Sequence, residues 1–346
     1  MLRSLLRRRS GLVALGGGLL VLGAVALAVV VGGGGGAGDA LVIYNGRSHY
    51  GTEQVFHDFE AETGIEVALR GGTAPELFER LRREGEDTPA DLLVTTDLAN
   101  LWRAQEAGML APVDTPTLRE HVPEGLYASD GTWWALTTRS RIPVVSTERV
   151  EEGAVERYED LGDPRFAGRT CLRTSTSEYN QSLVADMLAK RGHDATEELL
   201  RSWMANDPEV IGSDGEMLAL MASGDCDVGL SNDYYLGRAL EENPDFPVAP
   251  AWPDQGGAGA HTNVSGMGMV RWSDRHEDVI ALMEYLTSIE AQEQIAARSE
   301  LAAHPDVPAP EHIRDWRDVT RDPIDVERAG ALLEDAIALM VEVGWE

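Results

Sequence analysis

The sequence predicts an α/β protein with two lobes, each built on a mainly parallel sheet flanked by helices, with extended strands that cross between the lobes. Two observations lead to this prediction. Short apolar runs of strand length alternate with helical patterns, which is the order of βαβ units and favours parallel sheets. The chain has 346 residues and is 43% hydrophobic, and a chain of this length usually divides into two domains.

The alternation is clearest in the first block, which starts after residue 40. Gly64 and Gly108 stand where glycine commonly ends a helix, and Pro75 fits the first turn of another helix. In order, we expect a strand at 41–44, a helix through 55–59 that Gly64 ends, a strand at 65–69, a helix at 75–83, a strand at 92–94 and a helix at 98–107.

The rest of the chain forms a second block and then returns to the first. Ile142 to Val145 is an extended crossing segment and a candidate hinge. A second α/β block runs from about Thr170 to Pro250, and a strand at 267–270 returns to the first block. We therefore expect lobe 1 to comprise residues 40–140 and 262–346, and lobe 2 residues 141–261. Later helices are expected at 277–286, 291–298 and 325–343.

Residues 1–39 have the character of a membrane anchor or signal segment with a glycine tether. Gly11 to Val31 is an uncharged apolar run long enough to span a bilayer, and the arginines before it place the N-terminus in the cytoplasm and the body outside. The run is long for a signal peptide, which favours an uncleaved anchor over cleavage after Ala28. No cysteine lies near the run, which excludes a lipoprotein anchor.

The net charge is −30, from 59 acidic and 29 basic residues, and Lys190 is the only lysine. Such a surface argues against binding nucleic acid or anionic lipid, because both require basic patches. It suits a halophile, since concentrated salt screens the self-repulsion of the acids. A GC-rich genome that favours Arg over Lys is the alternative, but it leaves the surplus of acids unexplained.

The chain has two cysteines, Cys171 and Cys226. An even count in a protein outside the cell indicates a disulfide, and two buried thiols are the alternative. Cys171 ends the strand that leads to Tyr179, and Cys226 begins the strand that leads to Tyr234. If these strands are neighbours, the bond would tie together the two segments.

The adjacent tyrosines Tyr234 and Tyr235 follow a strand at 227–230 and precede a helical pattern at 236–242. Neighbouring side chains of a strand point to opposite faces, so both can serve one site only where the strand ends. Open α/β sheets bind ligands at that end. A deprotonated phenol is a hard oxygen donor, which suits a highly charged cation. A half-buried aromatic edge is the alternative for the pair alone.

Two other segments carry candidate site residues. In the segment 44–50, His49 and Tyr50 can each donate to a metal. In the segment 174–182, Tyr179 lies in the first turn of a predicted helix. Three hydroxyls precede that helix, and we expect one of them to cap it; a helix N-terminus also attracts anions. These hydroxyls belong to Ser175, Thr176 and Ser177.

From about residue 40 to 301, the chain resembles the ferric-ion solute-binding proteins of ABC transporters, which have the type II periplasmic binding fold. Two motifs, Tyr179-Asn180-Gln181-Ser182 and Tyr234-Tyr235, are specific to the iron branch. The wider fold is marked by the stretches 88–93, 101–108, 139–141, 261–266 and 286–288.

This resemblance implies that Tyr179, Tyr234 and Tyr235 bind Fe³⁺ as the transported ligand. Tyr50 corresponds to a further ligand that follows a histidine, here His49, although the loop is one residue longer than usual after Arg47. Relatives with a carboxylate ligand after the third strand have Glu where this chain has Thr96, so the resemblance implies a site rich in tyrosine.

Four phenolates exceed the charge of Fe³⁺ by one. Arg47, Arg139 or Arg141 can offset the excess or hold carbonate or another small anion, and salt bridges to the many acids are the alternative for these arginines. For His261, we expect a hydrogen-bonding role at the lobe junction and not a ligand role.

We therefore expect an extracellular, monomeric ferric-ion receptor that works with an ABC permease and ATPase. One rival is a receptor for another small ligand, such as a phosphonate, thiamine or a polyamine. A second is a membrane-anchored sensor ectodomain. The chain has no G-x-S-x-G, H-E-x-x-H or P-loop motif, so we expect no enzyme.

The acidic composition predicts that folding depends on salt. The Debye length falls from about 30 Å at 0.01 M salt to about 3 Å at 1 M, so repulsion among the acids is screened in concentrated salt. The melting temperature, followed by circular dichroism, should rise strongly from low to molar NaCl. A flat or falling response would leave genome composition as the explanation.

Overall fold

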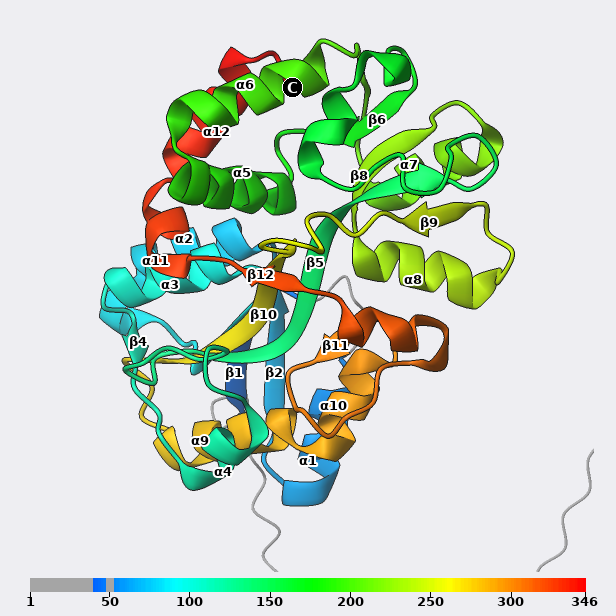
Figure 1. Ribbon diagram of the computed structural model, residues 1–346. Helices are drawn as coiled ribbons and strands as arrows, with labels where there is room; N and C mark the ends of the chain where they lie inside the picture. Colours follow the sequence, from blue (N-terminus) through cyan, green and yellow to red (C-terminus); the bar gives the residue numbers. More distant parts are fainter. Residues whose placement is uncertain (1–39, 48–52) are drawn as a thin grey trace, which may run out of the picture. The chain divides into compact units, whose positions relative to one another are not determined.

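The computed structural model describes residues 40–47 and 53–346, and these described residues form one compact unit (Figure 1). The predicted anchor and tether at 1–39, and the candidate ligands His49 and Tyr50, lie outside the described residues. Within the described part of the chain, no helix is both long and apolar enough to cross a membrane.

The strands form one mixed sheet whose central order is β2-β1-β3-β10-β5-β8-β6-β7. The short strands β4 and β12 pair with β10, and β9 and β11 pair with β5. The strands are β1 (Leu41–Asn45), β2 (Val67–Gly71), β3 (Leu92–Thr95), β4 (Leu110–Ala111), β5 (Trp134–Ser146), β6 (Thr170–Arg173), β7 (Glu209–Ile211), β8 (Val228–Asn232), β9 (Val248–Pro250), β10 (Ala260–Val270), β11 (Leu301–Ala302) and β12 (Arg321–Pro323).

The predicted parallel pairing is present at both ends of this order. β1 pairs in parallel with β2 and β3, and β6 pairs in parallel with β7 and β8. The sheet as a whole is mixed because β10 runs antiparallel to β3 and β5, and β5 runs antiparallel to β8. β5 pairs with β10 through Trp134–Ser140 and with β8 through Arg141–Val145. One strand therefore joins the two groups, as the crossing segment predicted, although it is much longer than 142–145.

Helices cover the faces of the sheet (Figure 1). Their positions agree with the alternation expected from the sequence in the first block, where Gly64 in the left-handed region ends α1. The α-helices are α1 (Gln54–Thr63), α2 (Ala74–Glu84), α3 (Leu98–Glu106), α4 (Pro116–His121), α5 (Glu178–Arg191), α6 (His193–Met204), α7 (Asp214–Ser223), α8 (Asp233–Glu242), α9 (His276–Thr287), α10 (Ile289–Ala296), α11 (Val326–Ala331) and α12 (Leu333–Glu342).

The C-terminal segment is two helices rather than the single predicted helix at 325–343, because the backbone leaves helical geometry at Leu332. Both helices pack on α5, and α11 also packs on α3. The indole of Trp345 packs edge-on against Trp203 and donates to the carbonyl oxygen of Arg173 at 2.8 Å. The end of the chain thus supports the strand end that precedes α5.

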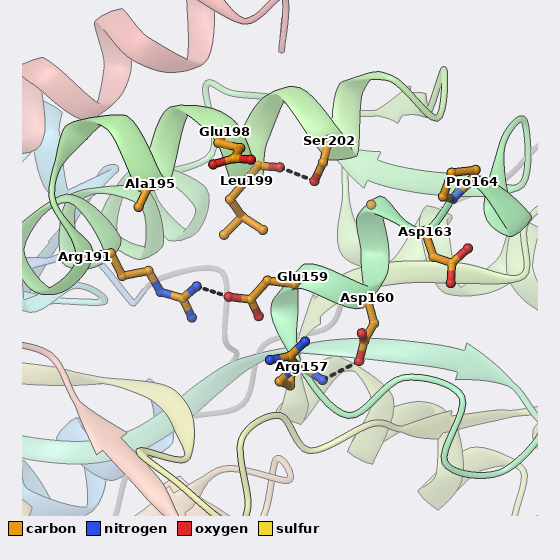
Figure 2. Close-up of a pocket in the computed structure, with 11 residues that line it drawn as sticks. Arg157, Glu159, Asp160, Asp163, Pro164, Arg191, Ala195, Glu198, Leu199 and Ser202 are labelled. Carbon is orange, nitrogen blue, oxygen red and sulfur yellow. Dashed lines mark hydrogen bonds and ion pairs between the residues drawn. The ribbon is translucent and has the colours of Figure 1, made fainter.

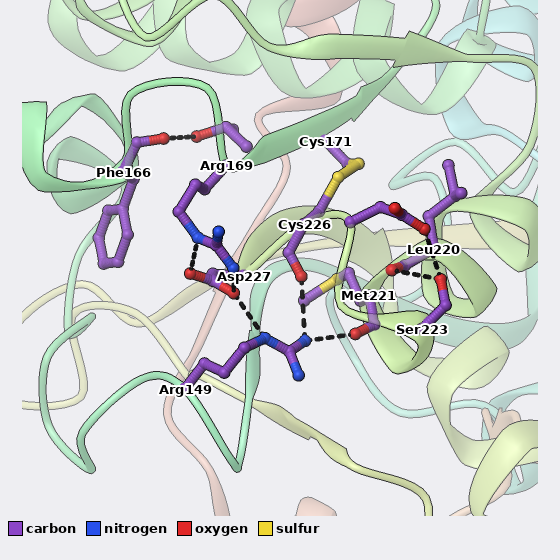
Figure 3. Close-up of a disulfide and its surroundings, with 11 residues drawn as sticks. Arg149, Phe166, Arg169, Cys171, Leu220, Met221, Ser223, Cys226 and Asp227 are labelled. Carbon is purple, nitrogen blue, oxygen red and sulfur yellow. Dashed lines mark hydrogen bonds and ion pairs between the residues drawn. A yellow bond between two sulfur atoms is a disulfide. The ribbon is translucent and has the colours of Figure 1, made fainter.

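The two cysteines are buried at disulfide distance, with their Cα atoms 5.8 Å apart (Figure 3). This separation lies within the range that a disulfide requires. Cys171 is in β6 and Cys226 precedes β8, which is the parallel neighbour of β6. The next residue, Asp227, bonds the guanidinium groups of both Arg149 and Arg169. A bond between them would therefore tie together the two strands that lead to Tyr179 and to Tyr234.

We predict that the native protein carries a Cys171–Cys226 disulfide. Mass spectrometry of unreduced, digested protein should recover the two cysteine peptides as one linked species. Reduction should lower the free energy of unfolding by about 2–4 kcal/mol, because the cross-link restricts the unfolded chain. Two thiols that alkylate without reduction in natively exported protein would show that the bond is absent.

Candidate metal centre

The tyrosine pair lies directly after β8, in the first turn of α8. The helix begins at Asp233, three residues before the predicted start at 236. The buried carboxylate of Asp233 accepts the backbone N–H groups of Tyr234 at 2.8 Å and of Ser140, in β5, at 3.0 Å. Burial raises the pKa of Asp233 to about 7, against the lowering effect of the Ser140 N–H. This residue fixes the start of α8 against the crossing strand.

The two rings of the pair are packed together, with centroids 4.4 Å apart and planes inclined by 33°. Tyr234 is fully buried at 0% exposure, and its hydroxyl accepts a long hydrogen bond of 3.4 Å from the side-chain amide of Asn232. Tyr235 is partly exposed and lines a cavity. The two rings therefore pack as the half-buried aromatic edge that was the alternative to a metal site. Tyr235 in addition lines a cavity.

Tyr179 comes from α5 and is 4% exposed. Two guanidinium groups lie near its ring, with Arg139 at 5.1 Å and Arg173 at 5.3 Å from the ring centroid. Arg173 pairs with Asp214 at 2.8 Å, and Arg139 lies 3.5 Å from Asp97. Burial alone would lower the pKa of Arg173, but Asp214 holds it above its usual value. Two fixed cations thus flank the phenol.

Tyr179 and Tyr235 line one cavity of about 510 Å³. One wall is the turn between β2 and α2, and the other is the N-terminal end of α5 with the first turn of α8. The described residues that line it are Gly72, Thr73, Pro75, Glu76, Arg173, Thr176, Ser177, Glu178, Tyr179, Gln181 and Tyr235. Tyr179 also borders a second space of about 10 Å³, with Arg139, Arg141, Asn232, His261 and Asn263.

The prediction that a hydroxyl caps α5 is wrong. Ser177 occupies the N-cap position, but its side chain makes no capping hydrogen bond. The preceding loop is held instead by Asn180, which donates to the carbonyls of Arg173 and Thr174 at 2.9 and 3.0 Å, and by Gln181, which donates to Ser175 at 3.0 Å. Because amides from within the helix fix the loop, the hydroxyl of Ser177 remains at the cavity wall.

The other two hydroxyls differ in their surroundings. Ser175 is buried behind the loop, and its backbone N–H donates to the carbonyl of Glu346 at 3.4 Å. Thr176 is exposed and its hydroxyl bonds that of Thr174 at 2.7 Å. Of the three, Thr176 and Ser177 line the cavity with the tyrosines.

Arg47 and Arg141 both form ion pairs with buried carboxylates. Salt bridges to acids were the alternative to an anion-binding role for these arginines. Arg47 pairs with Glu300 at 2.6 Å, and Arg141 pairs with Asp214 at 3.0 Å and bonds the side chain of Asn180 at 2.6 Å. Neither is among the described residues that line the 510 Å³ cavity of Tyr179 and Tyr235. Arg173 lines it instead. Sequence reasoning missed Arg173, although a basic residue at the end of a strand before the 174–182 segment was a usable signal.

A carboxylate beside Tyr179 was also missed. Glu178 accepts a hydrogen bond from the hydroxyl of Thr96 at 2.6 Å, which joins α5 to the end of β3. One turn later, the hydroxyl of Ser182 donates to Asp97. Burial raises the pKa of Glu178, and the charge of Asp97 adds to the shift. Nothing in a single sequence indicates that Thr96 and Glu178 meet, because they are far apart in the chain.

His261 has the role expected from the sequence, that of a hydrogen-bonding residue at the junction. Its Nδ1 atom lies 2.8 Å from a carboxylate oxygen of Asp186, on α5, and Lys190 lies 3.0 Å from the same oxygen. The backbone N–H of His261 donates to the hydroxyl of Tyr158 at 3.1 Å. These contacts tie β10 to α5 beside the smaller cavity.

A larger cavity of about 620 Å³ lies away from the tyrosines, against α6 (Figure 2). Its described lining is a mixture of acids and arginines, among them Glu159 and Arg191, which pair with each other. It shares no described lining residue with the tyrosine cavity. Cavity size therefore does not identify the candidate site; the convergence of Tyr179, Tyr235 and Arg173 does.

Residues 87–318 match the family described as bacterial extracellular solute-binding protein. The chain belongs to this family. It is 36% identical over 315 residues to iron uptake protein A1 of Synechocystis, a match that covers 88% of this chain and 87% of the relative. Such proteins bind and deliver solutes, so the chain is a solute-binding protein and not an enzyme.

Solved structures show the same α/β fold. A Trichodesmium protein (IdiA, FutA) in complex with iron and citrate superposes with a TM-score of 0.81 and 34% identity, over 89% of this chain and all of that one. A ferric binding protein from Campylobacter jejuni gives a TM-score of 0.82 and 28% identity, over 88% of this chain and all of that one. The fold class predicted from the sequence is confirmed.

We predict that Asp214 supports the 510 Å³ tyrosine cavity and the 10 Å³ space beside Tyr179. Its buried carboxylate bonds Arg141 at 3.0 Å and Arg173 at 2.8 Å. Asp214→Ala should lower the free energy of unfolding by about 3–5 kcal/mol, since it leaves two guanidinium groups without their shared partner. Urea titration measures the change. The matched control is Asp114→Ala, which breaks an exposed pair with Arg119 and should cost little. Equal effects of the two variants would contradict this account.

Proposed function

We propose that this protein is an extracellular ferric-ion receptor that delivers iron to an ABC importer. The observation that carries the proposal is the convergence of Tyr179 and Tyr235 on one cavity, with Arg173 beside them and Tyr234 packed behind. Phenolates are hard anionic donors, which suit Fe³⁺. Relatives named as iron uptake and ferric-binding proteins cover most of the chain, which supports the same ligand.

The proposed ligand set consists of Tyr179, Tyr234 and Tyr235, together with His49 and Tyr50 from outside the described residues. Tyr234 can join Tyr235 at one ion because the two follow the end of β8 in the first turn of a helix. In this structure the Tyr234 hydroxyl accepts a long hydrogen bond of 3.4 Å from Asn232, and binding the metal would require it to exchange this bond for a metal bond.

Each tyrosine must lose its proton to bind the metal. A phenol has an ordinary pKa near 10, so the site must favour the anion. Arg139 and Arg173 flank Tyr179 and act in this direction, since a neighbouring positive charge stabilises the phenolate. Their partners Asp97 and Asp214 keep them in place. The same two cations offset the surplus negative charge of several phenolates on one Fe³⁺.

A small anion, such as carbonate or citrate, is proposed to bind beside the iron at the N-terminal end of α5. The hydroxyl of Ser177 and the Nε atom of Arg173 are buried and have no hydrogen-bond partner among the described residues. The helix N-terminus adds backbone N–H donors. These groups support an anion contact at Ser177 and Arg173, which line the tyrosine cavity. Ser175, Arg47 and Arg141 are not among the described residues that line it.

The proposal extends to how the protein closes on the metal, where it is held and what receives the iron. We propose that lobe 1 (residues 40–140 and 262–346) and lobe 2 (residues 141–261) close on the metal, with β5 and β10 as the crossing strands. The protein acts as a monomer, held at the outer face of the membrane by residues 1–39, and a permease and ATPase receive the iron. The acidic surface adapts it to concentrated salt.

Removing single phenol oxygens tests the ligand set. Tyr234→Phe and Tyr235→Phe should each weaken Fe³⁺ binding by about tenfold or more, equivalent to at least about 1.4 kcal/mol, because each removes an anionic donor and keeps the ring. Tyr179→Phe should follow. The measurement is competition of apo-protein with citrate for Fe³⁺, read from the visible charge-transfer colour of ferric phenolate.

The matched control is Tyr127→Phe. Its ring stacks on Trp134 at 4.4 Å and its hydroxyl contacts the exposed Arg119, remote from the cavity lining. This variant should bind iron as the native protein does. Acid should bleach the colour, because protons compete for the phenolates. An apo-protein that takes no Fe³⁺ from citrate, or a Tyr234→Phe/Tyr235→Phe double variant that binds it normally, would overturn the assignment.

A further inference from the structure

Glu178 is an acidic residue placed within the tyrosine cavity. It is the first residue of α5, immediately before Tyr179, and it lines the same cavity as Tyr179, Tyr235 and Arg173. Its carboxylate oxygen Oε1 accepts a hydrogen bond of 2.6 Å from the hydroxyl of Thr96, at the end of β3. The carboxylate is therefore fastened to the end of β3 by a side chain that precedes it by 82 positions.

The carboxylate of Glu178 forms no ion pair with a side chain among the described residues. Among the same residues, Thr96 supplies its one hydrogen bond from a side chain. The two guanidinium groups that act on it, Arg139 and Arg173, are paired with Asp97 and Asp214. Glu178 is half-buried, and removing a carboxylate from water costs free energy unless a cation or several donors compensate it. A multivalent cation in the cavity would provide that compensation.

We propose that Glu178 is a further oxygen ligand of the metal in this cavity, and that Thr96 positions it. This inference rests on the proposed function. A carboxylate is a hard oxygen donor of the kind that Fe³⁺ favours. Hydrogen bonds to a ligating carboxylate orient it, and their loss typically weakens metal binding. Thr96 supplies such a bond through Oε1, which leaves Oε2 to face the ion.

The alternative is a structural role. An acid in the first turn of a helix interacts favourably with the helix dipole, and the bond to Thr96 would then only fasten α5 to β3. Under this alternative, the charge of Glu178 contributes to stability and leaves the spectrum of the bound metal unchanged. The two roles therefore differ in a spectroscopic property that folding does not affect.

The test compares Glu178→Gln with Glu76→Gln in the full-length protein loaded with Fe³⁺. Both remove one negative charge from the cavity wall. Glu76 is committed to the start of α2, where it accepts from the N–H and the hydroxyl of Thr73, both at 2.9 Å. It therefore serves as a control for the loss of charge alone. Affinity is measured by citrate competition, and the ligand environment by the position of the ferric phenolate absorption band.

Glu178→Gln should weaken Fe³⁺ binding by about tenfold or more, or 1.4 kcal/mol, and should shift the absorption band. Thr96→Val, which keeps the carboxylate and removes its positioning bond, should weaken binding by about tenfold. Glu76→Gln, which removes a charge from the same cavity wall, should weaken binding less than Glu178→Gln and leave the band unshifted. Thermal melting of each apo-variant checks folding; if Glu178→Gln fails to fold, Glu178→Asp and Thr96→Val are compared by the same two measurements.

Two results would overturn this inference alone. One is a Glu178→Gln protein that binds Fe³⁺ with native affinity and an unchanged band. The other is an equal loss in Glu178→Gln and Glu76→Gln without a band shift, which would indicate a general effect of charge. A native protein that takes up no Fe³⁺ would instead overturn the proposed function, and this inference with it.

Discussion

The buried carboxylate of Asp214 is the interaction on which the candidate site depends. It lies between Arg141 and Arg173, at 3.0 and 2.8 Å. Arg141 extends the network to Asn180 and Asn232, at 2.6 and 3.1 Å. Asn180 follows Tyr179 in α5, and Asn232 precedes α8, two positions before Tyr234. One carboxylate at the start of α7, through its two arginine partners, therefore links both helices that present tyrosines to the cavity.

The network also sets the charge of the cavity. Asp214 holds Arg173 near the ring of Tyr179, and Asp97 lies 3.5 Å from Arg139, the second guanidinium near that ring. Each guanidinium is fixed by an acid outside the cavity, so its positive charge remains available to anions inside. Phenolates and small anions are stabilised in such a site, and a metal that brings positive charge can then be bound by several of them. In this account, Arg139 and Arg173 both stabilise the fold through their ion pairs and favour the phenolate form of Tyr179.

Local sequence patterns predicted the first block and the tyrosines, because strand and helix periodicity and an adjacent aromatic pair are visible in a short window. The full length of β5 was missed, because buried arginines at 139 and 141 interrupt its apolar pattern. The capping prediction failed because the side chains of Asn180 and Gln181 hold the loop before α5. Arg173 and Glu178 were missed since their roles arise from partners distant in sequence, Asp214 and Thr96.

The most direct test of the central claim is a crystal structure of the iron-loaded protein, with the metal located by anomalous scattering at the iron edge. The account predicts one strong peak in the cavity formed by the N-terminal turns of α5 and α8, bonded to the phenol oxygens of Tyr179, Tyr234 and Tyr235. A peak elsewhere, or iron bound in that cavity without any of these three oxygens, would contradict it.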